Sequence, residues 1–378
     1  MTIKSTKSIG LCMIVKNEAH VIRRCLESVK PLIDFVHIDD TGSSDGTQQV
    51  IRDWLVQAGI PGEVADVPWQ DFASNRSHAL LSLRQHSEID YAMIIDADDT
   101  LQIKPEFDVH EFKQALVADL VDIDIHHGAI KYSRAQICRN SLEFSYRGVL
   151  HEFLQGPPGE IKRISIKGMF IHFGGGGARS MDPDKYIKDA TTLERALDVE
   201  TDTFLCARYT FYLAQSYRDS GQRQKALDAY LRRADMGFWQ EEVYVSLLQA
   251  AKLSEQLNHS EPDVIAAYQR AMNTLPSRVE ALHALSRYCR SKNRYEEGYQ
   301  FAQLGLERQP VDGLFVERWV YDYGLLDEYS INAFWTGRFT QSRDACNRIL
   351  QEAKIPMNLR ARVEANLVFA LGKLSDEA

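Results

Sequence analysis

The sequence lacks an uninterrupted apolar run of about 18 residues, the length that a membrane-spanning helix needs. Its first segment, MTIKSTKSIGLCMIVKNE, also lacks the long apolar core of a secretory signal, because Lys16 ends a short apolar stretch. It has no small-residue cleavage site either. We therefore expect no transmembrane segment, no secretion and a cytoplasmic location.

Paired cysteines and an excess of positive charge are missing too. The cysteines stand singly, with no C-x-x-C spacing, at positions 12, 25, 138, 206, 289 and 346. This pattern argues for reduced thiols and against a disulfide framework or a structural zinc site. A net charge of −9 disfavours nucleic acid as a partner.

What is present, in the first hundred residues, is an alternation of short apolar runs with helical patterns. Strands are expected at 9–15, 35–38, 62–67 and 91–95, and helices at 18–32, 45–57 and 72–83. This order predicts a parallel sheet covered by helices on both faces, with ligands beyond the carboxyl ends of its strands. Asn17, Asp40 and Asp96 all follow such ends.

The pattern changes twice further along the chain. Residues 120–173 contain the β-like runs VDIDIHH, KYSRAQICR and IKRISIKGMFIHF, which indicate a mixed extension of the sheet. After the segment GGGGARSM, Asp182 and Pro183 form a helix-start signal, and helical periodicity continues to the end. We predict an α/β nucleotide-binding domain at residues 1–178 and an all-α domain at residues 179–378.

The helical half repeats itself. Units beginning at Leu213, Leu247 and Leu285 share a spacing of small and aromatic residues, at offsets close to the length of a tetratricopeptide repeat. Two interpretations stay open. The helices form a stable C-terminal domain and nothing more, or they form a solenoid whose concave face binds a peptide.

The segment YAMIIDADDT ends an apolar run with Asp96, Asp98 and Asp99. Aspartate is a poor strand residue and is rarely buried without a partner. An Asp-x-Asp triplet alone is a weak signal, since roughly two are expected by chance in a chain of this length and three occur. Its position at a strand end is what favours a site over an ordinary turn.

Four ordered blocks together resemble a known family. They resemble segments of family 2 glycosyltransferases, which have the glycosyltransferase-A fold. The blocks are IVKNEAHVIRRCLESV, DDTGSSDGT, the pair DFASNRSHAL and YAMIIDADD, and YRGVLHEFL. The last block resembles a bacterial subset in which some members carry C-terminal tetratricopeptide repeats. The resemblance covers residues 8–175 and, more loosely, the repeats. It implies a nucleotide-sugar donor, with UDP as the nucleotide.

The resemblance also implies roles for individual residues. Those expected to contact the nucleotide sugar are Val15, Asn17, Glu18, Asp40, Arg76 and Asp96. Within this set, Asp40 is expected to accept a hydrogen bond from N3–H of uracil. Arg76 is expected to pair with the diphosphate or with Asp96, the alternative being a surface arginine.

A divalent cation is implied as the cofactor, because it neutralises the charge that grows on a diphosphate leaving group. Oxygen ligands suit Mn²⁺ or Mg²⁺. We expect Asp98 as a ligand, Asp96 beside it, and His172 as a late ligand or, alternatively, a core residue. Asp99 is either a neighbour of the metal or a solvated turn residue. The glycines that follow His172 are either a lid over the donor or a linker.

The base of an inverting transfer has to be sought outside the Asp-x-Asp segment. Many family members use a downstream Glu-Asp pair, which is absent here. The pair His151-Glu152 follows the aromatic-rich FSYRGVL. If this segment is extended, only one of the two side chains points at the site. We predict Glu152 as the base and His151 as its neighbour, the alternatives being the reverse assignment and a salt bridge from Glu152 to Arg147 or Lys162.

The function implied is a metal-dependent, inverting hexosyl- or N-acetylhexosaminyl-transferase. Its acceptor is a polypeptide or a glycan, free or lipid-linked, with the repeats aiding acceptor binding; self-association into a homo-oligomer is a further option. The alternative is a peptide-binding scaffold that retains a decayed, inactive transferase domain.

Overall fold

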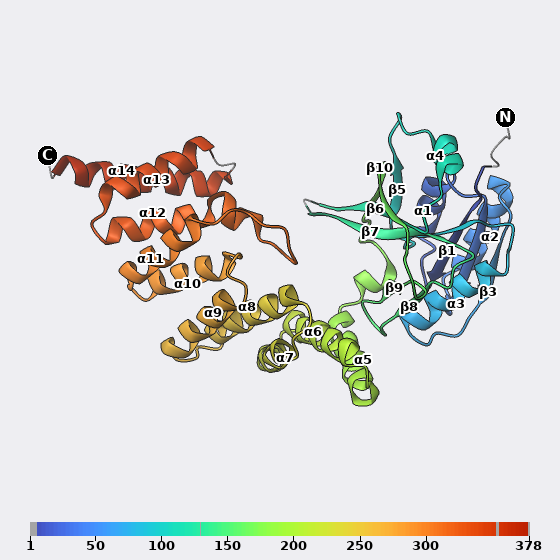
Figure 1. Cartoon of the computed structure of the whole chain (residues 1–378), viewed down its shortest axis with the longest axis horizontal. Helices are drawn as coiled ribbons and strands as arrows, with labels where there is room; N and C mark the ends of the chain where they lie inside the picture. Colours follow the sequence, from blue (N-terminus) through green and yellow to red (C-terminus); the bar gives the residue numbers. More distant parts are fainter. Residues whose placement is uncertain (1–5, 129, 353–354, 377–378) are drawn as a thin grey trace. The chain divides into compact units, whose positions relative to one another are not determined.

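The computed structural model describes residues 6–128, 130–352 and 355–376. The chain divides into two compact units, Met1–Ala196 and Leu197–Ala378 (Figure 1). The sequence placed a domain boundary after residue 178. The compact units instead divide within the long helix α5 (Lys185–Val199), most of which belongs to the first unit.

One mixed sheet organises the first unit. Within the described residues it has eight strands in the order β3-β2-β1-β4-β7-β6-β10-β5. Its strands are β1 (Ile9–Val15), β2 (Phe35–Asp40), β3 (Gly62–Asp66), β4 (Tyr91–Ile94), β5 (Thr100–Ile103), β6 (Leu120–His127), β7 (Ile130–Arg139) and β10 (Arg163–His172). The first four are parallel, and β7 and β5 run antiparallel to their neighbours. The predicted mixed, mostly parallel sheet is confirmed.

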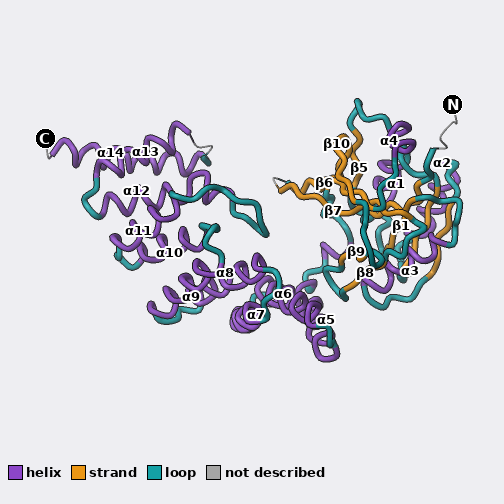
Figure 2. The backbone as a smooth tube through the Cα atoms, viewed as in Figure 1, coloured by secondary structure: helices purple, strands orange, loops and turns teal. Residues whose placement is uncertain are grey.

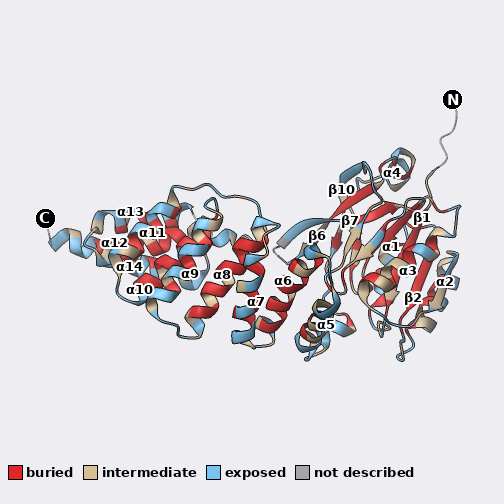
Figure 3. Ribbon diagram, turned by 60° about the horizontal axis from the view of Figure 1, so that its bottom comes forward, coloured by how far each residue is buried: buried red, intermediate tan, exposed pale blue. Residues whose placement is uncertain are grey.

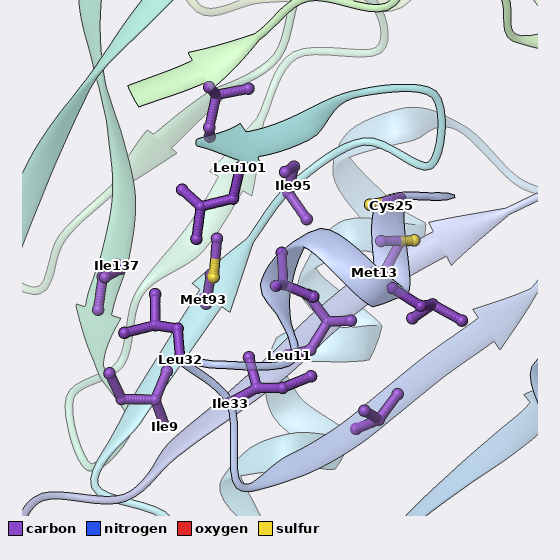
Figure 4. Packing of buried hydrophobic residues seen from close by; sticks show 14 of the residues in the cluster. Ile9, Leu11, Met13, Cys25, Leu32, Ile33, Met93, Ile95, Leu101 and Ile137 are labelled. Atoms are coloured by element: carbon purple, nitrogen blue, oxygen red, sulfur yellow. The ribbon is translucent and has the colours of Figure 1, made fainter. Parts of the chain in front are cut away.

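Helices cover both faces of the parallel part, as the chain order predicted. The helices of the first unit that precede α5 are α1 (Ile22–Val29), α2 (Thr47–Ala58), α3 (Phe72–Arg84) and α4 (Val109–Ala115). One face packs Ile9, Leu11 and Met13 of β1 against α1 and α2 (Figure 4). The other face packs Cys12 against Leu80 and neighbouring residues of α3. Strand β5 and helix α4 had no counterpart in the prediction.

A small second sheet joins the first unit beside α3. It pairs β8 (Ser145–Arg147) with β9 (Phe153–Gln155) in antiparallel fashion. The connection between them contains His151 and Glu152. His151 has a φ of 52°, in the left-handed region. The premise that this segment is extended is therefore wrong, because the chain reverses direction here instead of alternating its side chains.

The second unit contains only helices in its described residues (Figure 2). After the end of α5 they are α6 (Thr203–Asp219), α7 (Arg223–Asp235), α8 (Gln240–Gln256), α9 (Glu261–Thr274), α10 (Glu280–Ser291), α11 (Tyr295–Leu306), the π-helical turn η2 (Val320–Gly324), α12 (Leu325–Trp335), α13 (Phe339–Glu352) and α14 (Met357–Asp376). Each α-helix from α6 onward packs on the next α-helix, and their buried faces appear in red in Figure 3. The predicted all-α repeat region is confirmed.

The segment 307–319, between α11 and η2, contacts residues of repeats that come earlier in the chain. Leu314 donates its N–H to Glu241 of α8 at 3.1 Å, and its carbonyl accepts from Arg278 at 3.1 Å. Glu317 pairs with Lys252 of α8 at 2.7 Å. This segment therefore covers part of the surface formed by α8 and α10. No helix among the described residues is long and apolar enough to cross a membrane.

Candidate active site

The carboxyl end of β2 presents a buried aspartate with one unused oxygen. Asp40 is fully buried, and its Oδ1 accepts the N–H groups of Gly42 and Ser43 at 2.9 and 2.7 Å. Its Oδ2 is buried and has no hydrogen-bond partner. An unpaired buried acceptor is costly. Asp40 is thus held rigidly by one oxygen while the other is available to a donor group.

Residues at the end of β1 form hydrogen bonds with the loop that follows Asp40. Asn17 has a φ of 58°, and its Oδ1 accepts from Ser44 N–H at 2.8 Å, while its own N–H donates to Ser43 Oγ. The side chain of Val15 is buried in the core, and its carbonyl accepts from the N–H of Thr41 at 2.9 Å. Both predicted residues therefore lie at the site and shape its loop.

Arg76 links two acidic residues from distant parts of the chain. It projects from α3, and its guanidinium donates to Asp96 Oδ1 at 2.5 Å and to Glu152 Oε1 at 2.7 Å. Its guanidinium also lies 5.7 Å from the ring centroid of Tyr146. The surface alternative for Arg76 is wrong, since its side chain is only 13% exposed. Glu152 does form a salt bridge, but with Arg76 and not with Arg147 or Lys162.

These contacts set the ionisation of Asp96. Burial acts to raise the pKa of Asp96, but the positive charges of Arg76 and Arg134 outweigh it and lower the pKa to about 2. Arg134 of β7 lies 3.6 Å from Asp96 Oδ2. Arg134 and Tyr146 were not among the site residues predicted from the sequence. Both belong to segments predicted in the sheet extension, and only strand pairing brings them to this edge.

The glycine segment lies directly on the other acidic side chains. Gly174 and Gly177 donate their N–H groups to Asp99 Oδ1 at 3.0 Å and Asp98 Oδ2 at 2.9 Å, respectively. Ala178 donates to Glu18 Oε1 at 3.2 Å. Asp99 is only 2% exposed, so the solvated-turn alternative is wrong. The segment is bound to the site and is more than a linker.

The glycine segment packs over several carboxyl groups that lie close together. Burial is the main cause that raises the pKa of Glu18 to about 7, and the Asp98 carboxylate adds to the effect. Burial likewise raises the pKa of Asp99 to about 7, with contributions from Asp96 and Asp98. Glu18 Oε2 is buried without a hydrogen-bond partner. Such a group of carboxylates would be stabilised by a cation.

The predicted metal residues meet only in part. Asp96 and Asp98 leave the same strand end, whereas His172 is an exposed residue at the end of β10, in register with Thr100 of β5. Among the described residues, no three His, Cys, Asp or Glu side chains are grouped so that they could hold a metal ion. The oxygen-only donor set fits Mg²⁺ or Mn²⁺, provided that a bound diphosphate supplies further ligands.

Comparison with known proteins gives a family for part of the first unit and a relative of the chain. The family described as Glycosyl transferase family 2 matches residues 11–121 and confirms the resemblance drawn from the sequence blocks. A TPR repeat-containing protein of Synechococcus elongatus is 27% identical over 316 residues, which cover 79% of this chain and 72% of that protein.

Solved structures align with about half of the chain. A tetratricopeptide repeat protein from Parabacteroides merdae aligns with a TM-score of 0.39 at 19% identity, covering 51% of this chain and 69% of that chain. BtubC from P. vanneervenii aligns with a TM-score of 0.40 at 11% identity, covering 53% and 85%.

Proposed function

Since this chain carries a family 2 glycosyltransferase domain followed by tetratricopeptide-like helical repeats, we propose that it transfers a sugar, a hexose or N-acetylhexosamine, from a UDP-sugar to an acceptor with inversion. The observation that carries the proposal is the unpaired, buried Oδ2 of Asp40, which calls for a donor group. The choice of uracil over guanine, whose N1–H is a donor as well, follows from the family resemblance. Uracil offers N3–H as a donor for such an oxygen, and this pairing would remove the cost of leaving it unpaired.

The divalent cation belongs to the same proposal. Asp98 and Asp96 would hold Mn²⁺ or Mg²⁺, with Glu18 Oε2 close by, and His172 would join them only after the end of β10 shifts. The metal supplies charge neutralisation for the departing diphosphate. Asp98 could bind it through Oδ1 while Oδ2 accepts the N–H of Gly177, so the glycine segment would lie beside the bound donor.

Arg76 and Glu152 would act on the acceptor. Arg76 fixes the Glu152 carboxylate through Oε1 at 2.7 Å, and no hydrogen bond among the described residues holds Oε2. We assign Glu152 as the general base that takes the proton from the acceptor nucleophile. His151, in its left-handed turn, would orient the substrate beside it.

The repeats would add acceptor binding. Helical solenoids present extended surfaces to peptides, and a polypeptide or a glycan carrier would lie on the surface that segment 307–319 leaves open. The alternative, a scaffold with a decayed transferase domain, is disfavoured by the intact set of Asp40, Arg76, Asp96 and Asp98.

Calorimetric titration with UDP and GDP, each with and without Mn²⁺, tests the proposal. The wild type should bind UDP more tightly than GDP and only weakly without the metal. Asp40→Asn, which places an amide where an acceptor is needed, should weaken UDP binding by about tenfold or more, equivalent to about 1.4 kcal/mol. Asp98→Ala should remove the metal dependence and the turnover.

Asp53→Asn is the matched control, because Asp53 is exposed on α2, away from the site. Tighter binding of GDP than of UDP would refute the assignment of Asp40. Binding of neither nucleotide with Mn²⁺ would favour the scaffold.

A further inference from the structure

A cavity of about 540 Å³ lies within the first unit, next to the proposed donor site. One wall is the segment Trp69–Phe72 at the start of α3, and a second wall is Val149 and Leu150. Arg179 and helix α5 line the remaining side, and the cavity is open to solvent. None of the residues assigned above to the donor or the metal lines it, so it is a separate site.

Helix α5 turns a single polar face toward this cavity. Its lining residues are Lys185, Lys188, Asp189, Thr192, Arg195 and Ala196. Steps of three and four residues place them on one side of the helix. A helix face that packs on protein is usually apolar. Here it is mostly charged, and Lys188, Thr192 and Arg195 are exposed, so these groups are accessible to a polar ligand.

The positive charges of the cavity exceed what its acidic residues neutralise. Asp189 pairs with Arg179, and Asp182 pairs with Lys188 at 2.6 Å. The third acidic residue of the lining, Asp71, accepts the N–H and hydroxyl of Ser74 at the start of α3. Its charge remains, so the four cations and three acidic residues of the lining leave an excess of one positive charge. Two cations of α5 then remain, Lys185 and Arg195, for which the described part of the chain provides no ion pair.

The opposite wall is aromatic. Trp69 is 43% exposed, which is unusual for so large an apolar ring, and its centroid lies 4.8 Å from that of Phe72 in an edge-to-face arrangement. Phe72 is covered in turn by the guanidinium of Arg179, 4.5 Å away. A ring fixed in this way offers a flat surface against which the apolar face of a sugar can pack.

Three walls of the cavity continue directly into the proposed donor site. Phe72 stands one helical turn before Arg76 on the same side of α3. Leu150 precedes Glu152 by two residues, and Arg179 follows Ala178, whose N–H holds Glu18. A molecule in the cavity would therefore lie beside Arg76 and Glu152, where an acceptor nucleophile has to be.

We propose that this cavity is the acceptor site and that it takes an acidic glycan. Its sugar ring would pack on Trp69. Separate carboxylates or phosphates would pair with Lys185 and with Arg195, since ten residues of helix set these two about 15 Å apart. The assignment rests on the proposed transferase function. It adds the chemical class of the acceptor, and it places the reacting sugar in the first unit, whatever the repeats bind.

Binding of two probes of equal size to the full-length chain tests the charge preference. Tri-galacturonic acid carries carboxylates and maltotriose is neutral, and each is titrated in the presence of UDP and Mn²⁺. The wild type should bind tri-galacturonic acid at least tenfold more tightly than maltotriose. The double variant Lys185→Glu/Arg195→Glu should lose that preference, and Trp69→Ala should weaken both probes. Glucose 6-phosphate, compared with glucose, tests the phosphate source.

Lys30→Glu/Arg52→Glu is the matched control, since both residues are exposed outside the cavity. Arg195→Gln is the milder variant if circular dichroism shows that the double variant misfolds. Equal affinities of the wild type for the two trisaccharides, or unchanged tri-galacturonic acid binding in the folded cavity variants, would overturn the acidic-acceptor site. UDP binding by the same variants separates the two proposals, because its absence from the wild type would refute the transferase function instead.

Discussion

Arg76 connects two acidic side chains of the site, those of Asp96 and Glu152. Its guanidinium holds Asp96 on one side and Glu152 on the other. The Asp96 carboxylate is kept ionised by Arg76 and Arg134 against the cost of burial. Removing one partner from such a network leaves the others as unpaired charges, which is more costly than losing a surface ion pair. Conservative substitutions are therefore the informative ones here.

Glu152→Gln keeps the shape of the side chain and an oxygen that accepts from Arg76, but removes the basic carboxylate. We expect kcat to fall by about 10² or more, the usual contribution of general-base catalysis, while UDP binding with Mn²⁺ is retained. Steady-state kinetics together with calorimetry measure both quantities. Normal transfer by Glu152→Gln, combined with an inactive His151→Ala, would reverse the assignment.

His283, in α10, gives the second unit a pH-dependent stability. Burial lowers the pKa of His283 to about 4, although Glu328 and Glu317 act to raise it. In the unfolded state the His283 imidazole therefore takes up a proton near pH 6.5, whereas in the folded state it stays neutral until the pH is much lower. This contribution to stability is complete above about pH 6.5 and is lost as the pH falls toward 4.

Between pH 7.5 and pH 5, the wild type should lose up to about 2 kcal/mol more unfolding free energy than His283→Gln. Urea unfolding of both proteins at the two pH values measures the difference. Parallel losses would show that His283 titrates normally in the folded chain. Carboxylates that also titrate in this range contribute to both proteins and cancel in the comparison.

At the scale of elements, the glycine segment after β10 has a position at which the structure leaves no room for a side chain. A Cβ atom on Gly174 would lie 1.7 Å from the carbonyl oxygen of Asp98, an impossible distance. A Cβ atom on Gly176 would meet only Val21, at an ordinary 3.8 Å. The two positions thus differ sharply in space, although they are two residues apart in the same segment.

Gly174→Ala should therefore push the segment away from Asp98 and Asp99, whereas Gly176→Ala should not. We expect Gly174→Ala to cost about 1–3 kcal/mol of stability, the usual range for overpacking. Thermal melting and UDP binding of the two variants, measured side by side, give the result. Identical melting temperatures would show that the segment is not held on the acidic residues in solution.

At the scale of the whole molecule, the division after Ala196 gives α5 a role in the first unit. Leu193 of α5 is fully buried and Asp189 is paired with Arg179. A truncation after residue 182, close to the predicted start of the helical domain at residue 179, would remove α5 entirely. A truncation after Ala196 would keep this helix together with Arg179, its ion-pair partner in the first unit.

We predict that the fragment 1–196 unfolds cooperatively and binds UDP with Mn²⁺, while the fragment 1–182 unfolds at a lower temperature. If the repeats hold the acceptor's carrier, the fragment 1–196 should hydrolyse the donor but transfer poorly to the natural acceptor. Calorimetric melting and a donor-hydrolysis assay provide the measurements. Full transfer by a folded 1–196 fragment would leave the repeats with a structural role only.

The sequence by itself determined the elements and the polar residues at their ends. Strands β1 to β4, their helices and the later repeats follow from hydrophobic periodicity, a local property that neighbouring residues carry. Asn17, Asp40 and Asp96 were located in the same way, because parallel strands bring their carboxyl ends to one edge.

Only the tertiary structure decided which of these groups touch. The bridge from Arg76 to Asp96 and Glu152 joins α3, β4 and the turn after β8. The contact of Gly174 and Gly177 with Asp99 and Asp98 joins residues more than 70 positions apart. Neither leaves a periodic trace in the chain, because such contacts depend on strand order and on the packing of loops. The left-handed turn at His151 and the charged cavity face of α5 were missed for the same physical reason.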